Sequence, residues 1–274
     1  MKKKPINYIV FYTIAAVAVS IYFFPMISLF LNSFKDLKDI YLNVLGFPTQ
    51  FNFKNYKDAI EGMDFFRTLL NSVVISGTTA VFTAFFSAMA GWALERYKRK
   101  VSTVIYMLLA GSMLIPFQCV MLPLIRLLKA GGMMNRLGLI FSYIGLYSSM
   151  CVILVAGYVK SIPVEVEEAA LIDGCNSFQV FFHVVFPLLK PILVTVLILS
   201  MINTWCDYLL PSLIINRAGM QTLPLKTYSF ISQFVKRWEL ASAGMVLCNI
   251  PAMIFYILCQ KEIINGVTTG AVKG

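Results

Sequence analysis

Charged residues divide the chain into long uncharged stretches, and this pattern predicts its architecture. Five long stretches carry no charge, and a sixth carries only Asp207. A helix needs about 20 mostly apolar residues to cross a bilayer. We therefore predict an all-α integral membrane protein, a single transmembrane domain over residues 1–274, with six spans at about 8–31, 70–94, 103–125, 139–159, 191–213 and 240–260.

Composition agrees with a membrane protein. Hydrophobic residues make up 59% of the chain and charged residues only 13%, whereas soluble domains carry roughly 25% charged residues. The start, Lys2 to Lys4 followed by an apolar run, resembles a signal peptide, and residues 16–18 resemble a cleavage site. Because the apolar run continues to Leu31, too far for a signal peptide, we favour an uncleaved first span.

The sequence has few candidate metal ligands and lacks the pattern of a nucleic-acid-binding surface. The chain has one histidine, His183, which excludes a histidine-based metal cluster, and its six cysteines form no Cys-x-x-Cys pair. No basic stripe with interleaved aromatic residues accompanies the net charge of +10, so we attribute this charge to anchoring at a lipid surface. We predict no metal site, no nucleic-acid partner, and contact with the lipid bilayer.

Basic clusters in short segments predict the orientation. Lys2 to Lys4 and the cluster at 96–100 fall on the same side of the membrane if six spans alternate. Positive charge in short loops marks the cytoplasm. Lysine and arginine totals on the two sides are nearly equal, so the prediction rests on these two clusters. Both termini, the loop 160–190 and the tail 261–274 are then cytoplasmic, and residues 40–53 are extracytoplasmic.

The loop 160–190 carries four acids against two bases, which is unusual for a cytoplasmic loop. Pro163 suits the first turn of a helix, and the acids that follow suit a helix N-terminus. Gly174 is placed to end this helix in a left-handed conformation. We expect Ser177 to cap a second helix over 178–185, which Pro187 helps to stop.

Two roles are open for this helix–turn–helix loop. An amphipathic element lying on lipid would favour lysine and arginine on its polar face, and the acids argue against it. The second helix carries Phe178, Phe181 and Phe182, an aromatic surface that no span covers. Docking to a cytoplasmic protein is therefore the better interpretation.

The same loop carries a recognisable motif. Glu168-Ala169-Ala170, three residues, Gly174, nine residues and then 184–187 resembles the signature of bacterial ABC-importer permeases, Glu-Ala-Ala, three residues, Gly, nine residues, Ile-x-Leu-Pro. Val184 and Phe186 depart from it conservatively.

The resemblance extends to other segments of the chain. Residues 32–35, 53–56, 114–118 and 265–274 are similar to segments of carbohydrate permeases of the maltose type, in particular the shorter permease subunit of the pair. Residues 204–211 depart from that family, which usually shows Asn and Trp at the positions of Cys206 and Leu210, so this segment does not identify a substrate.

The resemblance implies a subunit of an ATP-driven sugar importer in the bacterial inner membrane. It implies a second homologous permease subunit, a cytoplasmic ATPase dimer and an extracytoplasmic sugar-binding protein as partners. The loop between spans 4 and 5 would be the coupling helix, and the tail would dock near the ATPase dimer interface. The implied coupling residues are Glu165, Glu168, Ala169, Ala170, Asp173, Gly174, Phe178, Phe181 and Pro187, and the implied tail-docking residues are Gly266, Thr268 and Gly270.

The chain contains no Gly-x-x-x-x-Gly-Lys-Ser/Thr sequence, so it has no phosphate-binding P-loop of its own. ATP would be held by the partner ATPase. We expect no cofactor bound by this chain, no catalytic residues and no enzymatic activity.

Polar side chains inside spans are costly and usually face the protein interior or a water-filled cavity. They are equally able to hold helices together through interhelical hydrogen bonds. The candidates for a substrate path are Gln118, Asn203, Asp207 and Asn249.

Three other functions compete with the sugar importer. A permease of the same class for a non-sugar solute has the same features. An ion-driven secondary transporter predicts internal repeats and ionisable residues at mid-membrane, and the spans show one acid, off centre, and no clear repeat. A structural or assembly subunit does not need a patterned acidic loop.

Overall fold

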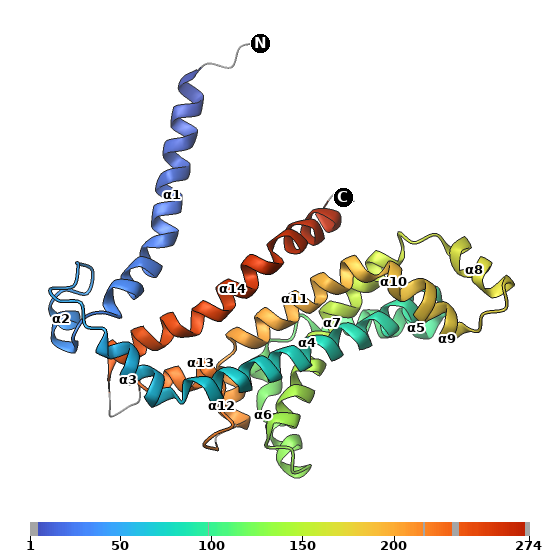
Figure 1. The fold of residues 1–274 in the computed structure, drawn as a ribbon. Helices are drawn as coiled ribbons and strands as arrows, with labels where there is room; N and C mark the ends of the chain where they lie inside the picture. The colour runs from blue at the N-terminus through green and yellow to red at the C-terminus, as the bar shows by residue number, and fades with distance from the viewer. Residues whose placement is uncertain (1–4, 98, 216, 232–235, 272–274) are drawn as a thin grey trace. The chain divides into compact units, whose positions relative to one another are not determined.

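The computed structural model describes residues 5–97, 99–215, 217–231 and 236–271. Regular structure in these ranges is helical, apart from one isolated β-bridge between Ile231 and Lys236. The prediction of an all-α membrane protein is confirmed. The elements (Figure 1) are α1 (Pro5–Asn32), α2 (Leu37–Leu42), α3 (Lys54–Met63), α4 (Phe65–Arg96), α5 (Lys100–Ser112), α6 (Phe117–Ala130), α7 (Arg136–Val159), α8 (Val164–Ile172), α9 (Ser177–Gln179), the π-helix η1 (Val180–Val185), α10 (Phe186–Leu188), α11 (Lys190–Cys206), α12 (Leu209–Ile214), α13 (Leu223–Tyr228) and α14 (Trp238–Ala271).

Four helices are long and apolar enough to cross a membrane, within α1, α4, α7 and α14. Up to six spans result if each of two bent pairs is one span. These pairs are α5 with α6, bent by 106°, and residues 177–188 with α11, bent by 75°.

Two of the predicted spans contain breaks. The stretch 103–125 is interrupted because Pro116 lacks a backbone N–H and keeps the residue before it out of the helical region, so α6 begins only at Phe117. The stretch 191–213 is interrupted after Cys206, where Asp207 adopts an extended conformation with φ −76° and ψ 133°. The carboxylate of Asp207 then accepts a hydrogen bond from the backbone N–H of Leu209 at 2.9 Å, where α12 begins.

The chain forms two compact units. The first contains α1 to α3, α13 and α14 up to Pro251, and the second contains α4 from Leu69 through α12 and the remainder of α14. In the first unit α3 packs against α13, and the hydroxyl of Thr227 lies 3.2 Å from the sulfur of Met63.

The segment after α1 in the first unit is held by a buried lysine. The ammonium group of Lys35 donates to the carbonyl of Asn43 at 2.6 Å, and the side chain is fully buried. Burial lowers the pKa of Lys35, and the nearby carboxylate of Asp39 opposes this shift.

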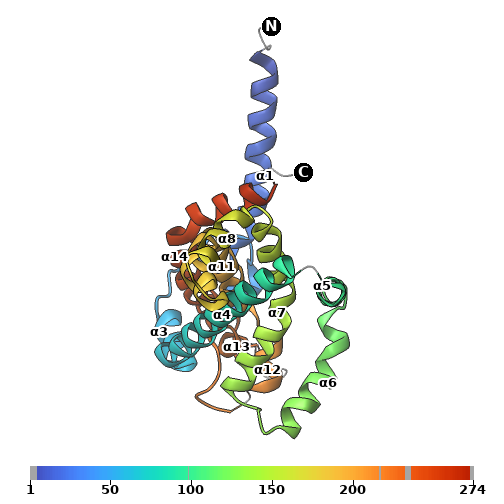
Figure 2. The same cartoon turned by 90° about the vertical axis from the view of Figure 1, so that its right-hand side faces the viewer.

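The second unit is built on α4, α7 and α11, which contribute to one apolar core (Figure 1, Figure 2). Helices α4 and α7 cross closely at Gly91, where a Cβ would lie 2.7 Å from a methyl carbon of Val155. The same core includes Ile162 and, from η1, Val180, Phe181 and Val185. The segment between α7 and α11 is therefore rooted in the bundle rather than appended to it.

Candidate functional site

The segment with the Glu168 to Pro187 motif lies at the end of the second unit where α4 and α7 end and α11 begins (Figure 1, Figure 2). Its first helix, α8, starts directly after Pro163, whose missing N–H is tolerated there. Glu165 and Glu167 occupy the first turn, where the helix dipole favours negative charge.

The first helix ends in the conformation that the sequence predicts. Gly174 has φ +89°, a left-handed conformation that glycine adopts without a steric penalty. The N–H of Cys175 bonds to the carbonyl of Ala170 at 3.0 Å, and the N–H of Gly174 to that of Leu171 at 3.1 Å. This pair of bonds is a Schellman motif, which satisfies the last carbonyl groups of α8.

The second helix differs from the prediction at both ends. Asn176, rather than Ser177, is the N-cap: its side chain accepts from the N–H of Gln179 at 2.9 Å, and the Gln179 side chain accepts in return from the N–H of Asn176. An asparagine in this position offers a side-chain carbonyl for a reciprocal capping box. Helical structure also continues past Val185, because Pro187 lies in the first turn of α10, where a missing N–H is tolerated.

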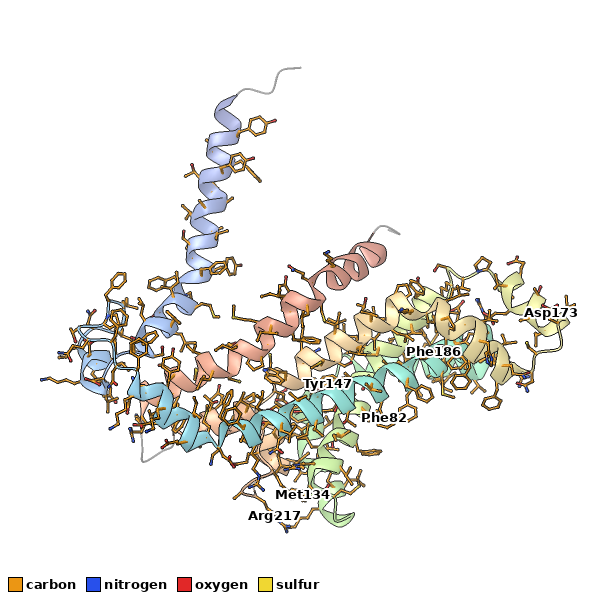
Figure 3. The ribbon with its side chains drawn as sticks, viewed as in Figure 1. Phe82, Met134, Tyr147, Asp173, Phe186 and Arg217 are labelled. Atoms are coloured by element: carbon orange, nitrogen blue, oxygen red, sulfur yellow. The ribbon has the colours of Figure 1, made fainter. Side chains whose placement is uncertain are left out.

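Most of the predicted coupling residues lie on the surface of this segment, and Figure 3 shows Asp173 at its outer tip and Phe186 nearer the bundle. Ala170 is half-buried against the core. Phe181 departs from the expected aromatic surface: it is only 3% exposed, and its ring lies 5.2 Å from that of Trp92. The exposed members of the set are Glu165, Glu168, Ala169, Asp173, Gly174, Phe178 and Pro187.

A buried ion pair joins α8 to the end of α4. Glu167 accepts from the Arg96 guanidinium, Nε to Oε1, at 2.7 Å, and from the Trp92 indole, Nε1 to Oε2, at 2.9 Å. Arg96 also donates through Nη2 to the carbonyl of Ile162 at 2.8 Å. The side chains of Arg96 and Glu167 are 13% and 8% exposed.

Sequence reasoning missed this cluster. In the sequence, Arg96 belongs to the basic cluster at 96–100 that predicts orientation, and Glu167 is one of four acids in the loop 160–190. The available signal is the i,i+4 spacing of Trp92 and Arg96, which places both on one face of α4. Nothing in the sequence pattern links that face to a residue 71 positions later.

The predicted tail-docking residues are Gly266, Thr268 and Gly270. The backbone of α14 runs through them. Their side-chain surroundings lie outside the described residues, and their role stays a prediction.

A groove lies in the second unit, away from α8. It has a volume of about 480 Å³, and its lining comes from the α5–α6 bend, α7 and the start of α12. The rings of Tyr143 and Tyr147 stack there with centroids 5.6 Å apart and planes 7° apart. Tyr143 donates its hydroxyl to Asp207 Oδ2 at 2.8 Å, and the hydroxyls of Ser112 and Ser149 are 2.7 Å apart.

Of the four predicted substrate-path residues, only Asp207 lines this groove. Gln118 and Asn203 are exposed and lie outside its lining. Asn249 belongs to the first unit and donates to the carbonyl of Met245, one turn earlier in its own helix, at 2.8 Å. The tyrosines of the groove were missed, although their i,i+4 spacing places them on one face of an apolar helix.

No group of three histidine, cysteine, aspartate or glutamate side chains in the described part of the chain is arranged to hold a metal ion.

Comparison with known proteins identifies relatives over nearly the whole chain. Residues 81–263 match the family of binding-protein-dependent transport system inner membrane components. The chain is 40% identical over 249 residues, 91% of both chains, to the probable starch degradation products transport system permease protein AmyC of Thermoanaerobacterium thermosulfurigenes. It is 32% identical to the melibiose/raffinose/stachyose import permease protein MelC of Bacillus subtilis (strain 168), over 95% of both chains.

A third relative is the arabinooligosaccharides transport system permease protein AraQ of the same strain, which is 32% identical over 93% of this chain and 92% of its own length. A solved structure of a bacterial ABC transporter involved in the import of the acidic polysaccharide alginate contains a chain with the same fold. That chain superposes with a TM-score of 0.80 at 21% identity, over 95% of this chain and 98% of that one.

Proposed function

Because the chain belongs to the family of binding-protein-dependent transport system inner membrane components, we propose that it is one membrane-spanning permease subunit of an ATP-driven sugar importer. It is a multi-pass membrane transport protein and not an enzyme. The names of three relatives refer to starch degradation products, to melibiose, raffinose and stachyose, and to arabinooligosaccharides. These names favour an oligosaccharide as the substrate.

The importer contains a second permease subunit, a cytoplasmic ATPase dimer that uses ATP, and an extracytoplasmic sugar-binding protein. The single observation that carries this proposal is the segment from α8 to α10. Its outer surface is acidic and includes exposed apolar side chains such as Phe178, which is 71% exposed, while its inner surface belongs to the bundle core. Aromatic side chains are enriched at protein interfaces, so an exposed Phe178 on a segment rooted in the bundle suits docking to a partner protein.

The same proposal fixes the orientation of the chain. If α8 docks to the ATPase, the end of the second unit that carries α8 is cytoplasmic. Both termini are then cytoplasmic as well, and the tail that includes Gly266, Thr268 and Gly270 extends toward the ATPase.

The groove at Asp207 is the proposed sugar path of this subunit. Sugar hydroxyls donate to carboxylates, and the apolar face of a sugar ring packs on aromatic rings. Asp207 and Tyr147 supply these two groups side by side in a groove of about 480 Å³. Each carboxylate oxygen accepts more than one hydrogen bond, so Asp207 keeps capacity for a ligand beyond Tyr143 and Leu209.

Reconstitution tests the function. The chain is purified with its co-expressed partner subunits, inserted into liposomes, and supplied with its binding protein and labelled melibiose, maltotriose or arabinotriose. We expect uptake of at least one of these sugars, and this uptake should require ATP on the side of the membrane that carries the ATPase. If the purified chain alone transports a solute under a proton or sodium gradient, the importer assignment is wrong. ATP-dependent uptake of a non-sugar solute only would replace the sugar assignment and keep the class.

A further inference from the structure

We propose that Arg96, Glu167 and Trp92 form a clamp that fixes the position of α8 on the bundle and thereby transmits ATPase movement to α4. The inference rests on the proposed function. It assigns to these residues a positioning role in coupling, and none of them needs to touch the ATPase or the substrate.

The burial of α8 leads to this inference. Glu167 is the one residue of this helix that is buried. Its apolar residues are exposed instead, with Val164 44%, Val166 43% and Ile172 86% accessible. A force applied to the outer surface of α8 therefore reaches the bundle through the carboxylate of Glu167, the half-buried Ala170 and the packing of α8 against η1, and of these only the carboxylate is fixed by charge-assisted hydrogen bonds.

The clamp holds α8 in a defined direction. Both oxygens of the carboxylate are used, one by the guanidinium at 2.7 Å and one by the indole at 2.9 Å. The guanidinium also binds the carbonyl of Ile162, two residues before α8, at 2.8 Å. Arg96 thus grips both the helix and the segment that leads into it.

The other end of the clamp is equally well anchored. Arg96 and Trp92 belong to the last turns of α4, and Gly91 allows α4 to pack tightly against α7, where a Cβ would lie 2.7 Å from Val155. Trp92 contacts Phe181 of η1 through its ring. A displacement of α8 is therefore delivered to α4, α7 and η1 together.

Stability alone does not account for such a cluster. Removing two charges from water is costly, and well-packed apolar side chains of similar size are often as stabilising as a buried ion pair. What an apolar contact lacks is direction, because it permits sliding and rotation that two charge-assisted hydrogen bonds forbid. The clamp therefore suits transmission of movement better than it suits stabilisation.

The test compares two ways of changing the clamp in the reconstituted importer. Arg96→Met with Glu167→Met removes both charges and fills the space with apolar atoms. Arg96→Lys keeps the charge but loses the planar fork that binds Glu167 and Ile162. Lys160→Gln is the control: Lys160, at the end of α7, pairs with Glu95 of α4 at 3.8 Å, but its side chain is 60% exposed.

The readout is the number of sugar molecules imported per ATP hydrolysed. The amount of ATPase that co-purifies and the thermal midpoint of the complex are measured on the same samples. We expect both clamp variants to retain the ATPase, and the double variant to lose less of its thermal midpoint than the single variant Glu167→Met, which leaves the charge of Arg96 without its counter-ion. The import ratio should fall at least about fivefold, the lower end of coupling between distant sites. Lys160→Gln should leave it unchanged.

A wild-type import ratio in the double variant would overturn the inference. So would a fall in the ratio that occurs only in step with loss of the ATPase, because the cluster would then serve assembly alone. Failure of the proposed function looks different, since in that case the wild-type complex itself shows no ATP-driven import.

Discussion

The two candidate regions of the second unit each hold a carboxylate that accepts a hydrogen bond from an aromatic side chain, but only one of the two carboxylates is paired with a basic side chain. Glu167 accepts from Trp92 and is paired with Arg96. Asp207 accepts from Tyr143, and within the described ranges no lysine or arginine forms an ion pair with it. Glu167 is buried, whereas Asp207 lines an open groove.

This difference predicts a structural role for Glu167 and a ligand-binding role for Asp207. When both oxygens of a carboxylate are bound and its charge is compensated, as in Glu167, the group holds two elements together and is not available to a ligand. A partly exposed carboxylate without a basic partner has acceptor capacity left for a ligand. The comparison predicts that changes at Glu167 affect folding and coupling, whereas changes at Asp207 affect transport of the ligand.

The largest effect is expected for Glu167→Ala. Removal of one partner leaves Arg96 partly buried without its counter-ion, which typically costs about 3 kcal/mol or more. The thermal midpoint and yield of the purified complex should fall clearly. An unchanged midpoint would mean that water solvates the guanidinium of Arg96 and that the pair is not buried in the assembled importer.

Asp207→Asn should leave assembly intact and lower the efficiency of uptake. Loss of one charge-assisted hydrogen bond corresponds to about 1.5 kcal/mol, or roughly tenfold. The measurement is ATP-driven uptake at several sugar concentrations, with Cys206→Ser as a neighbouring control outside the groove. Wild-type uptake by the Asp207 variant would remove the groove from the sugar path.

Gly174→Val tests the turn that ends α8. No atom lies within 4 Å of a Cβ at this position, so the effect comes from the left-handed backbone alone and should be about 1 kcal/mol or slightly more. We expect a several-fold loss of sugar imported per ATP. Gly157→Ala is the matched control. A Cβ at Gly157 also has no atom within 4 Å, and this glycine lies in the regular helix α7.

The smallest effect is expected at the cap of the second helix. Asn176→Ala removes the capping box and should destabilise this turn by about 1 kcal/mol. Limited proteolysis between α8 and α9 measures it. Ser177→Ala should not change the rate of cleavage. If Ser177→Ala increases cleavage more than Asn176→Ala does, the N-cap is Ser177, as the sequence predicts.

Much of the molecule was predictable, for identifiable physical reasons. Long uncharged stretches allow only helices in a bilayer, so the all-α membrane fold followed from hydropathy. The motif from Glu168 to Pro187 identified the permease family, and the family match confirms it. The left-handed conformation of Gly174 is predictable because helices commonly end at a glycine in this conformation.

What the sequence did not predict depends on contacts between distant segments. The bond between Arg96 and Glu167 and that between Tyr143 and Asp207 join residues 71 and 64 positions apart. Local pattern also could not show that Phe181 turns inward, because three phenylalanines close together are compatible with either face of a short helix. The break at Asp207, which adopts an extended conformation, leaves no mark in the hydropathy pattern.

If an ATPase drives this chain through α8, sugar uptake depends on ATP hydrolysis through the clamp of Arg96, Glu167 and Trp92. Sugar uptake and ATP hydrolysis are recorded in the same liposomes for the wild type and for Arg96→Met with Glu167→Met. We expect ATP-dependent uptake in the wild type and continued hydrolysis with much less uptake in the double variant. Uptake that needs no ATPase, driven by an ion gradient across the membrane, would contradict it.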